Sequence, residues 1–317
     1  MQNVKTILMA ATALAYVAIP SAHATGNKAV ITQDGSTNFV EIIQDAADGE
    51  GHDANANVQG IENKVYIDQG NPSANSIGRN NYADVDVLNV VGSSSKENVI
   101  KIIQQNDRIA ATNDANHNDS IVRVEGDRNE VATKQSFNNN YSYVRISGDT
   151  GVGEGDDNTV TVLQTGNNAQ ARTYIVGDEN DVEITQNSNN EARVKIDGDG
   201  EGFSNTVEIS QERTAFPGAS NTAWVDIFGD ENLVSIDQIG NGNLADIDIG
   251  LNGVESLENK FQVLQEGENN KAYGRVDGSL NNAYVQQFGS YNTAYVNQYG
   301  TDNTANVYQN GNAVGTY

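Results

Sequence analysis

The sequence predicts an all-β fold, a β-solenoid with two strands per turn, about eleven rungs and amyloid-like ladders of stacked side-chain amides. Three observations predict it. A short unit, Asn-x-(Ala/Val)-x-(Val/Ile)-x-Gln, recurs along almost the whole chain. Its apolar positions recur every second residue, which is the period of an extended strand and not of a helix. None of the 3 prolines falls inside a predicted strand, where the missing N–H would interrupt a sheet.

The unit is most regular at the C-terminal end, where copies cover residues 281–287, 292–298 and 303–309. These copies recur every 11 residues, which leaves room for only one strand and one turn per copy. With the pairs upstream there are thirteen asparagines that have a glutamine six residues later. The upstream pairs are Asn27 with Gln33, Asn38 with Gln44, Asn63 with Gln69, Asn98 with Gln104, Asn129 with Gln135, Asn158 with Gln164, Asn180 with Gln186, Asn205 with Gln211, Asn232 with Gln238 and Asn259 with Gln265.

A second unit lies between these copies and carries one more aliphatic residue in place of glutamine, followed by glycine. The segment from Asn221 to Gly229 is a clear example. Copies that begin at Asn168 and Asn243 fit with the glycine shifted by one residue, and the copy at Asn55 is the weakest. The two units alternate between residues 63 and 270, so we expect Gln-strands to stack on Gln-strands and Gly-strands on Gly-strands.

The two ends of the chain differ from its acidic middle. Residues 1–24 combine Lys5, an apolar stretch and Ala22-His23-Ala24, the pattern of a secretory signal peptide. Residues 25–270 are predicted to form an acidic solenoid body. Residues 271–317 hold two basic residues, two acidic residues and seven of the 13 tyrosines, so this end is neutral and aromatic.

Composition narrows the classes of partner. The formal net charge is −25, whereas nucleic acids and anionic membranes are bound through basic patches. We therefore expect no nucleic-acid partner and no membrane insertion. The chain has no cysteine, so hydrogen bonds between rungs must replace the disulfides on which many exported proteins rely. Nothing in the sequence calls for a cofactor.

The amides explain why the rungs should stack in one register. Strands spaced by about 4.8 Å place each inward Asn over another Asn and each Gln over another Gln. A buried amide without a partner would cost roughly 1–3 kcal/mol, so a slipped register is disfavoured. No charged cap follows the last unit, which leaves an edge able to pair with another chain. The residues expected to form this self-assembly ladder are Asn281, Gln287, Asn292, Gln298, Asn303, Gln309, Tyr295, Tyr299 and Tyr308.

The run from Asn292 through Gln298, Gly300, Asn303 and Gln309 to Gly311 resembles the curlin repeat of curli subunits, the bacterial extracellular amyloid fibres. The resemblance implies a secreted subunit at the surface of a Gram-negative bacterium that polymerises there for adhesion and biofilm matrix. It also implies a nucleator subunit and an outer-membrane export pore as partners. The chain departs from the family in its Gly-type strands and longer acidic loops, and it has no Gly-rich segment after the leader. Major subunit and nucleator both remain open.

Other functions have weaker support. A monomeric secreted β-solenoid adhesin could bind calcium through acidic loops, with Asp149, Asp156, Asp157, Asp197 and Asp199 as weak ligand candidates. These acids lack the fixed spacing of calcium β-rolls. An ice-binding or carbohydrate-binding solenoid is a further alternative, but ice binders present regular rows of threonine, for which Thr222, Thr293 and Thr304 are too few. No nucleophile and base stand in a catalytic pattern, so we expect no enzyme.

Overall fold

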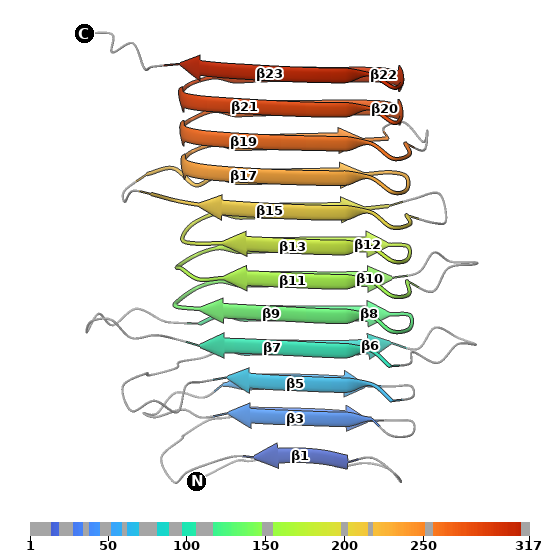
Figure 1. Ribbon diagram of the computed structural model, residues 1–317. Coiled ribbons are helices and arrows are strands. Elements are labelled where there is room, and N and C mark those ends of the chain that lie inside the picture. The colour runs from blue at the N-terminus through green and yellow to red at the C-terminus, as the bar shows by residue number, and fades with distance from the viewer. Residues whose placement is uncertain are drawn as a thin grey trace.

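The computed structural model is a single stack of strands that climbs from the N-terminus to the C-terminus (Figure 1). It describes residues 14–18, 28–33, 38–44, 52–58, 62–69, 81–88, 97–105, 117–147, 155–197, 202–214, 218–250 and 256–311. Within these residues there are 23 strands and no helix, so none that could cross a membrane. The prediction of an all-β solenoid with two strands per turn and about eleven rungs is confirmed.

The strands alternate between two parallel sheets, of 12 strands (sheet A) and 11 strands (sheet B). Sheet A contains β1 (Leu14–Ala18), β3 (Phe39–Gln44), β5 (Lys64–Gln69), β7 (Val99–Gln105), β9 (Glu130–Ser136), β11 (Thr159–Gln164), β13 (Asp181–Gln186), β15 (Thr206–Glu212), β17 (Leu233–Asn241), β19 (Lys260–Glu268), β21 (Asn282–Ser290) and β23 (Thr304–Gly311). Sheet B contains β2 (Lys28–Gln33), β4 (Asp53–Val58), β6 (Tyr82–Leu88), β8 (Asp119–Glu125), β10 (Tyr141–Ser147), β12 (Gln170–Val176), β14 (Glu191–Ile196), β16 (Thr222–Ile227), β18 (Leu244–Ile249), β20 (Lys271–Ser279) and β22 (Thr293–Thr301).

Every second residue of a strand points into a thin core between the sheets. In β11 the side chains of Val160, Val162 and Gln164 are buried, while those between them face outward. Val and Ile fill most inward positions because branched side chains suit extended backbone. At one level of the core, a large side chain in sheet A faces a glycine in sheet B. Phe261 takes a valine position in sheet A, and a Cβ on Gly274 in sheet B would collide with its ring.

Two starting points predicted from the sequence are wrong. The weak copy placed at Asn55 begins at His52, because Asn55 faces outward on β4 whereas His52 occupies the asparagine position and accepts a hydrogen bond from the Asn81 backbone N–H at 3.3 Å. The copy placed at Asn168 begins at Ala169, whose backbone N–H donates to Asn140 Oδ1 at 3.0 Å. Asn168 itself is a turn residue with φ +57°. Counted from Ala169, the glycine of this unit stands at its usual position, Gly177. The asparagine lies one residue too early instead.

The lower end of the stack involves the predicted signal peptide. β1 lies within residues 1–24 and pairs with β3 in sheet A. β2 follows and pairs with β4 in sheet B, with Gln33 in register with Val58. The chain therefore enters sheet B directly after the predicted leader and ends in sheet A with β23.

Candidate functional site

The asparagines that open the strands of sheet A form a hydrogen-bonded ladder. The Nδ2 group of each one donates to Oδ1 of the asparagine one rung below, from Asn98 to Asn303, at 2.8 to 3.1 Å. The same Oδ1 accepts the backbone N–H of the next rung, as in the 3.0 Å bond from Asn205 to Asn180. A buried amide is satisfied here only when another rung lies against it.

The glutamines that close these strands form a second ladder and also join the two sheets. Eight Nε2 to Oε1 bonds of 2.7 to 3.0 Å run upward from Gln104 to Gln309. Each Nε2 also donates across the core to the first carbonyl of a sheet B strand, as Gln186 does to Gln170 at 3.0 Å. The sequence predicted the stacking but not this bond, which holds the turn from sheet A to sheet B.

The asparagines of sheet B are bonded differently. Their Oδ1 atoms accept the backbone N–H of the next rung, whereas Nδ2 usually donates to a turn carbonyl, as Asn221 does to Gly240 at 2.9 Å. A side-chain bond to the rung below appears at the upper end, from Asn292 to Asn270 at 2.9 Å. The expectation that each asparagine amide bonds the next holds fully in sheet A and only locally in sheet B.

Glycines in the turns allow adjacent rungs to approach closely. Gly267 and Gly278 have φ of +118° and +125°, a region that favours glycine. A Cβ at Gly278 would collide with the carbonyl oxygen of Gly300 in the rung above. Gly300 has φ +95°, but a Cβ there would meet only Asn303 Nδ2 at 3.9 Å. The space above Gly300 is therefore open.

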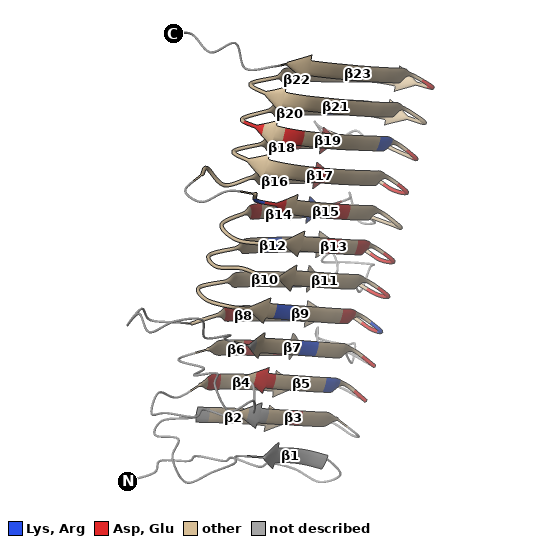
Figure 2. Cartoon of the chain, turned by 60° about the vertical axis from the view of Figure 1, so that its left-hand side comes forward, with Lys and Arg blue, Asp and Glu red and all other residues tan. Residues whose placement is uncertain are grey.

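The open end is formed by β22 and β23. In β21, one rung below β23, Ala283 and Val285 are 0% exposed, whereas Ala305 and Val307 of β23 are partly exposed. Asn281 and Gln287 of the predicted ladder are buried beneath the end, and Asn303 and Gln309 stand at its surface. β21, β22 and β23 carry no charged residue, whereas most of the strands below them carry at least one (Figure 2).

Gln298 is unlike the other glutamines of the predicted ladder because it lies in sheet B. Its neighbour below is Val276, not a glutamine. Its Nε2 donates to backbone carbonyls of Asn282 and Asn303 at 3.0 and 3.1 Å. Its side chain is 4% exposed, and Oε1 has no hydrogen-bond partner among the described residues. The stacking of glutamine on glutamine is thus wrong for this copy.

The three tyrosines predicted for the ladder lie on the outer faces of the sheets and not along the upper edge. Tyr295, 71% exposed, stacks on Tyr273 of the rung below with ring centroids 4.9 Å apart and planes 10° apart. Tyr308 lies tilted over Phe288 at 5.9 Å, and Tyr299 lies under the Arg275 guanidinium at 6.0 Å. Each of these rings continues a lateral column that stops at the end of the stack.

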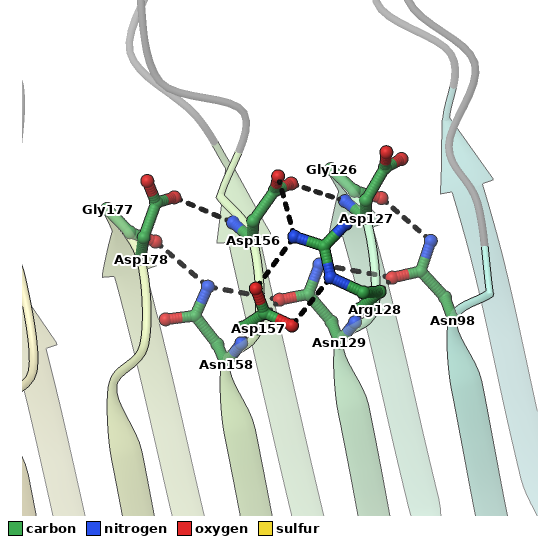
Figure 3. Close-up of polar contacts among 10 residues, drawn as sticks. All are labelled: Asn98, Gly126, Asp127, Arg128, Asn129, Asp156, Asp157, Asn158, Gly177 and Asp178. Atoms are coloured by element: carbon green, nitrogen blue, oxygen red, sulfur yellow. Dashed lines mark hydrogen bonds and ion pairs between the residues drawn. The ribbon is translucent and has the colours of Figure 1, made fainter.

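The turns that lead from sheet B to sheet A carry carboxylates in successive rungs (Figure 3). Asp156 accepts the backbone N–H of Asp127 at 2.6 Å, and Asp178 accepts that of Asp156 at 2.7 Å. Arg128 makes a two-pronged contact with Asp157 at 2.8 and 2.7 Å. Burial raises the pKa of Asp156. These carboxylates cap backbone N–H groups of the next rung.

The weak calcium candidates that the structure describes, Asp156, Asp157 and Asp197, contact basic side chains. Asp149 and Asp199 lie outside the described residues. Asp156 and Asp157 contact Arg128, and Asp197 contacts Lys195 Nζ at 3.0 Å. In the described ranges no group of three or more His, Asp or Glu side chains is placed to hold a metal ion.

Comparison with known families supports the resemblance seen in the sequence. The family model described as the curlin associated repeat matches residues 155–187 and 258–300. The first match spans β11 to β13, and the second spans β19 to β22. No curated protein matches the chain.

Proposed function

We propose that this chain, which the curlin associated repeat model matches over residues 155–187 and 258–300, is a secreted structural subunit that self-assembles into extracellular curli-like amyloid fibres. The family is one of structural subunits and not of enzymes. In this proposal the fibre lies on the surface of a Gram-negative bacterium and serves in adhesion and biofilm matrix. A nucleator subunit and an outer-membrane export pore are the further partners. The main observation that supports this proposal is that the two end strands of sheet B match one another and differ from the strands between them.

The match is seen at one register position of sheet B. The two end strands carry Gln33 and Gln298 at this position. The nine strands between them carry an aliphatic residue in the same register: Val58, Val87, Val124, Ile146, Ile175, Ile196, Ile227, Ile249 and Val276. A second copy stacked on the first would bring Gln33 over Gln298. An amide would then meet an amide, which an interior strand would not provide.

The order of the strands favours the same junction. The proposed mature chain begins after residue 24, so β1 is removed and β3 becomes the lower edge of sheet A. β2 of a second copy would follow β22 in sheet B, and β3 would follow β23 in sheet A. Asn38 and Gln44 of β3 would then continue the ladders that stop at Asn303 and Gln309.

The outer rows would also be compatible. In this register Val30 of the incoming copy lies over Tyr295, and Glu41 lies over the neutral Asn306. No two like charges face each other across the described strands of the junction. Burial of the partly exposed Ala305 and Val307 would add roughly 25 cal/mol for each Å² of apolar surface removed from water.

Matched substitutions at the two ends test the proposal. Gln298→Val or Gln33→Val alone would place valine against glutamine and slow the elongation of seeds by about tenfold, since one unmatched buried amide costs roughly 1–3 kcal/mol. The double variant restores a like pair and should elongate faster than either single variant. Elongation is measured by thioflavin fluorescence with seeds and monomer of the same variant.

The melting temperature of the monomer supplies the control. Gln298→Val removes a buried oxygen that lacks a partner among the described residues, but it also removes the two bonds from Nε2 to the Asn282 and Asn303 carbonyls, so elongation is compared at temperatures where the monomer of each variant is folded. Slower elongation would then come from the junction and not from misfolding. A double variant no faster than the single ones would reject this junction. A wild-type chain that remains monomeric with seeds would reject fibre assembly and favour the adhesin.

A further inference from the structure

The outer face of sheet B carries a group of cations that the net charge of −25 conceals. Arg145, Arg172, Arg193 and Lys195 face outward on the successive strands β10, β12 and β14. Together with Ser147 and Tyr174 they line a groove of about 480 Å³. A volume of this size suits a ligand of a few rings, in the usual range of roughly 300–1,000 Å³.

The strand register orders these side chains around one aromatic ring. Arg145, Tyr174 and Lys195 occupy one row across the three strands. Arg172 and Arg193 occupy the neighbouring row. Strands are spaced by about 4.8 Å, so the backbone positions of Arg145 and Lys195 are about 10 Å apart with the tyrosine between them. The register therefore places a cation on each side of Tyr174, whose ring also packs against that of Tyr143 with the centroids 5.2 Å apart.

The arginines of the groove are not neutralised by nearby acids. Lys195 contacts Asp197 at 3.0 Å and Asp226 at 3.9 Å. Arg172 lies over the ring of Tyr141 at 5.6 Å. No ion pair of Arg145, Arg172 or Arg193 occurs within the described parts of the chain. A guanidinium presents a planar fork of N–H donors that fits a carboxylate or another oxyanion.

Acidic residues on both sides limit what can lie in the groove. Asp226, Asp246 and Asp248 follow on β16 and β18, and Asp84 and Asp86 precede on β6. A duplex nucleic acid, with one charge per about 1.7 Å, would meet these carboxylates if it ran along the stack. The acidic turn column of a second copy would meet them as well. A ligand with few and well-separated anionic groups avoids this repulsion.

We propose that the groove binds an anionic sugar segment of an acidic polysaccharide. Carboxylates of the sugars pair with Arg145, Arg172 and Arg193. The Tyr174 ring packs against a sugar face, and Ser147, although 8% exposed, adds a polar side chain to the lining. The groove lies on the side of the stack, so it does not depend on whether the ends polymerise.

Binding of polygalacturonate, a polymer of carboxylated sugars, to the purified chain tests the proposal. The triple variant Arg145→Gln, Arg172→Gln, Arg193→Gln should bind at least about tenfold more weakly, since each charge-assisted bond contributes on the order of 1 kcal/mol or more. The matched control is Lys64→Gln, Lys101→Gln, Lys134→Gln, which removes three exposed cations from sheet A. The control should bind like the unaltered chain.

Additional probes separate the possible ligands. A neutral polysaccharide should bind weakly, and dextran sulfate, which carries sulfates and no carboxylates, distinguishes sulfated from carboxylated sugars. Tyr174→Ser should weaken polygalacturonate binding, because a purely ionic patch would not need the ring. Equal binding by the arginine triple variant, or equal binding of the neutral polymer, would overturn the proposal. Tighter groove-dependent binding of single-stranded DNA would assign the groove to nucleic acid, and a dimer lost in the triple variant would assign it to a second copy.

Discussion

At the scale of single residues, stability depends on whether each buried polar atom finds a partner in the adjacent rung. The amide of Asn205 shows a complete set. It donates to Asn180 Oδ1 at 3.0 Å and to the Gly229 carbonyl at 2.8 Å, and its Oδ1 accepts two bonds of 3.0 Å from Asn232. A shorter, longer or charged side chain would lose part of this set, which explains why asparagine recurs at the position.

Two buried threonines provide an isosteric comparison. The hydroxyl of Thr133 bonds that of Ser120 at 2.7 Å, whereas Thr173 Oγ1 has no partner within the described residues. Thr173→Val should raise the free energy of unfolding by about 1 kcal/mol, because it removes an unsatisfied polar atom. Thr133→Val should lower it by a similar amount, since Ser120 is left unpaired. Chemical denaturation of both variants checks the opposite signs, and equal signs would contradict the assignment.

Two turn glycines separate fold from assembly. Gly278→Ala should destabilise the monomer by several kcal/mol, because its Cβ collides with the Gly300 carbonyl and its φ is positive. Gly300→Ala should cost the monomer only about 1–2 kcal/mol of backbone strain. Its methyl group would nevertheless occupy the space of a carbonyl in an added rung, so seeded elongation should fall. Melting temperature and elongation rate are measured together; unchanged elongation in Gly300→Ala would argue against addition at this end.

The sequence predicted individual residues well where the unit is regular and poorly where a residue was replaced. Asn168 was taken as a ladder residue because it is an asparagine, but turns accept asparagine at positive φ as readily as strands place it inward. His52 was missed because histidine breaks the pattern of letters, although its Nδ1 accepts the same bond from Asn81. Only the register of neighbouring strands resolves such cases.

At the scale of elements, each strand is defined by what faces it in the adjacent strand. β16 and β18 place Asp226 directly beside Asp248, and Trp224 beside Asp246. Burial, followed by the nearby Asp246 and Asp226, raises the pKa of Asp248 to about 6. Like charges in register destabilise a sheet, so this pair of strands is less stable at neutral pH than its apolar core suggests.

Asp248→Asn tests this effect. A carboxyl whose pKa is raised on folding binds its proton more tightly in the folded state, so stability falls as pH rises from about 4 to about 6. The substitution should therefore stabilise the chain at pH 7, by roughly 1 kcal/mol after allowance for solvent screening, and have little effect at pH 4. Denaturation at both pH values measures the difference. Glu130→Gln, at an exposed carboxylate of β9 that lies between Val99 and Thr159, is the control and should be nearly neutral.

Elements were the most predictable level, because period-two hydrophobicity and turn residues determine a strand locally. The alternation of Gln-strands and Gly-strands, and their separation into two sheets, follow from the spacing of the unit. The exceptions are β2 and β22, which carry glutamine yet belong to sheet B. The local sequence of β22 is that of a sheet A strand. Its place in sheet B becomes clear only when the alternating strands are counted from the lower end. The groove of outward arginines was missed for a similar reason. The net charge of the chain is strongly negative, and only the strand register shows that several arginines lie side by side.

At the scale of the whole molecule, the two ends are chemically alike and differ from the interior. Interior rungs pair an amide column in sheet A with an aliphatic column in sheet B, whereas the end rungs carry glutamine in both sheets. Such a difference has no benefit inside an isolated monomer, where Gln298 Oε1 stays without a partner among the described residues. It becomes favourable once the ends meet. In the proposed assembly, an amide from the next copy would offset this cost at Gln298.

Removal of the upper rung tests this explanation. A chain that lacks residues 291–317 keeps the interior rungs but ends in sheet B at Val276. An incoming Gln33 would then face valine, so elongation should slow by about tenfold or more. Val276→Gln in the shortened chain recreates the amide end and should restore much of the rate, whereas Val276→Leu should not. Thioflavin kinetics with matched seeds measure all three chains. Equal rates for the glutamine and leucine variants would mean that the side-chain amides of the end rung do not contribute to elongation. Growth would then depend on the backbone edge alone.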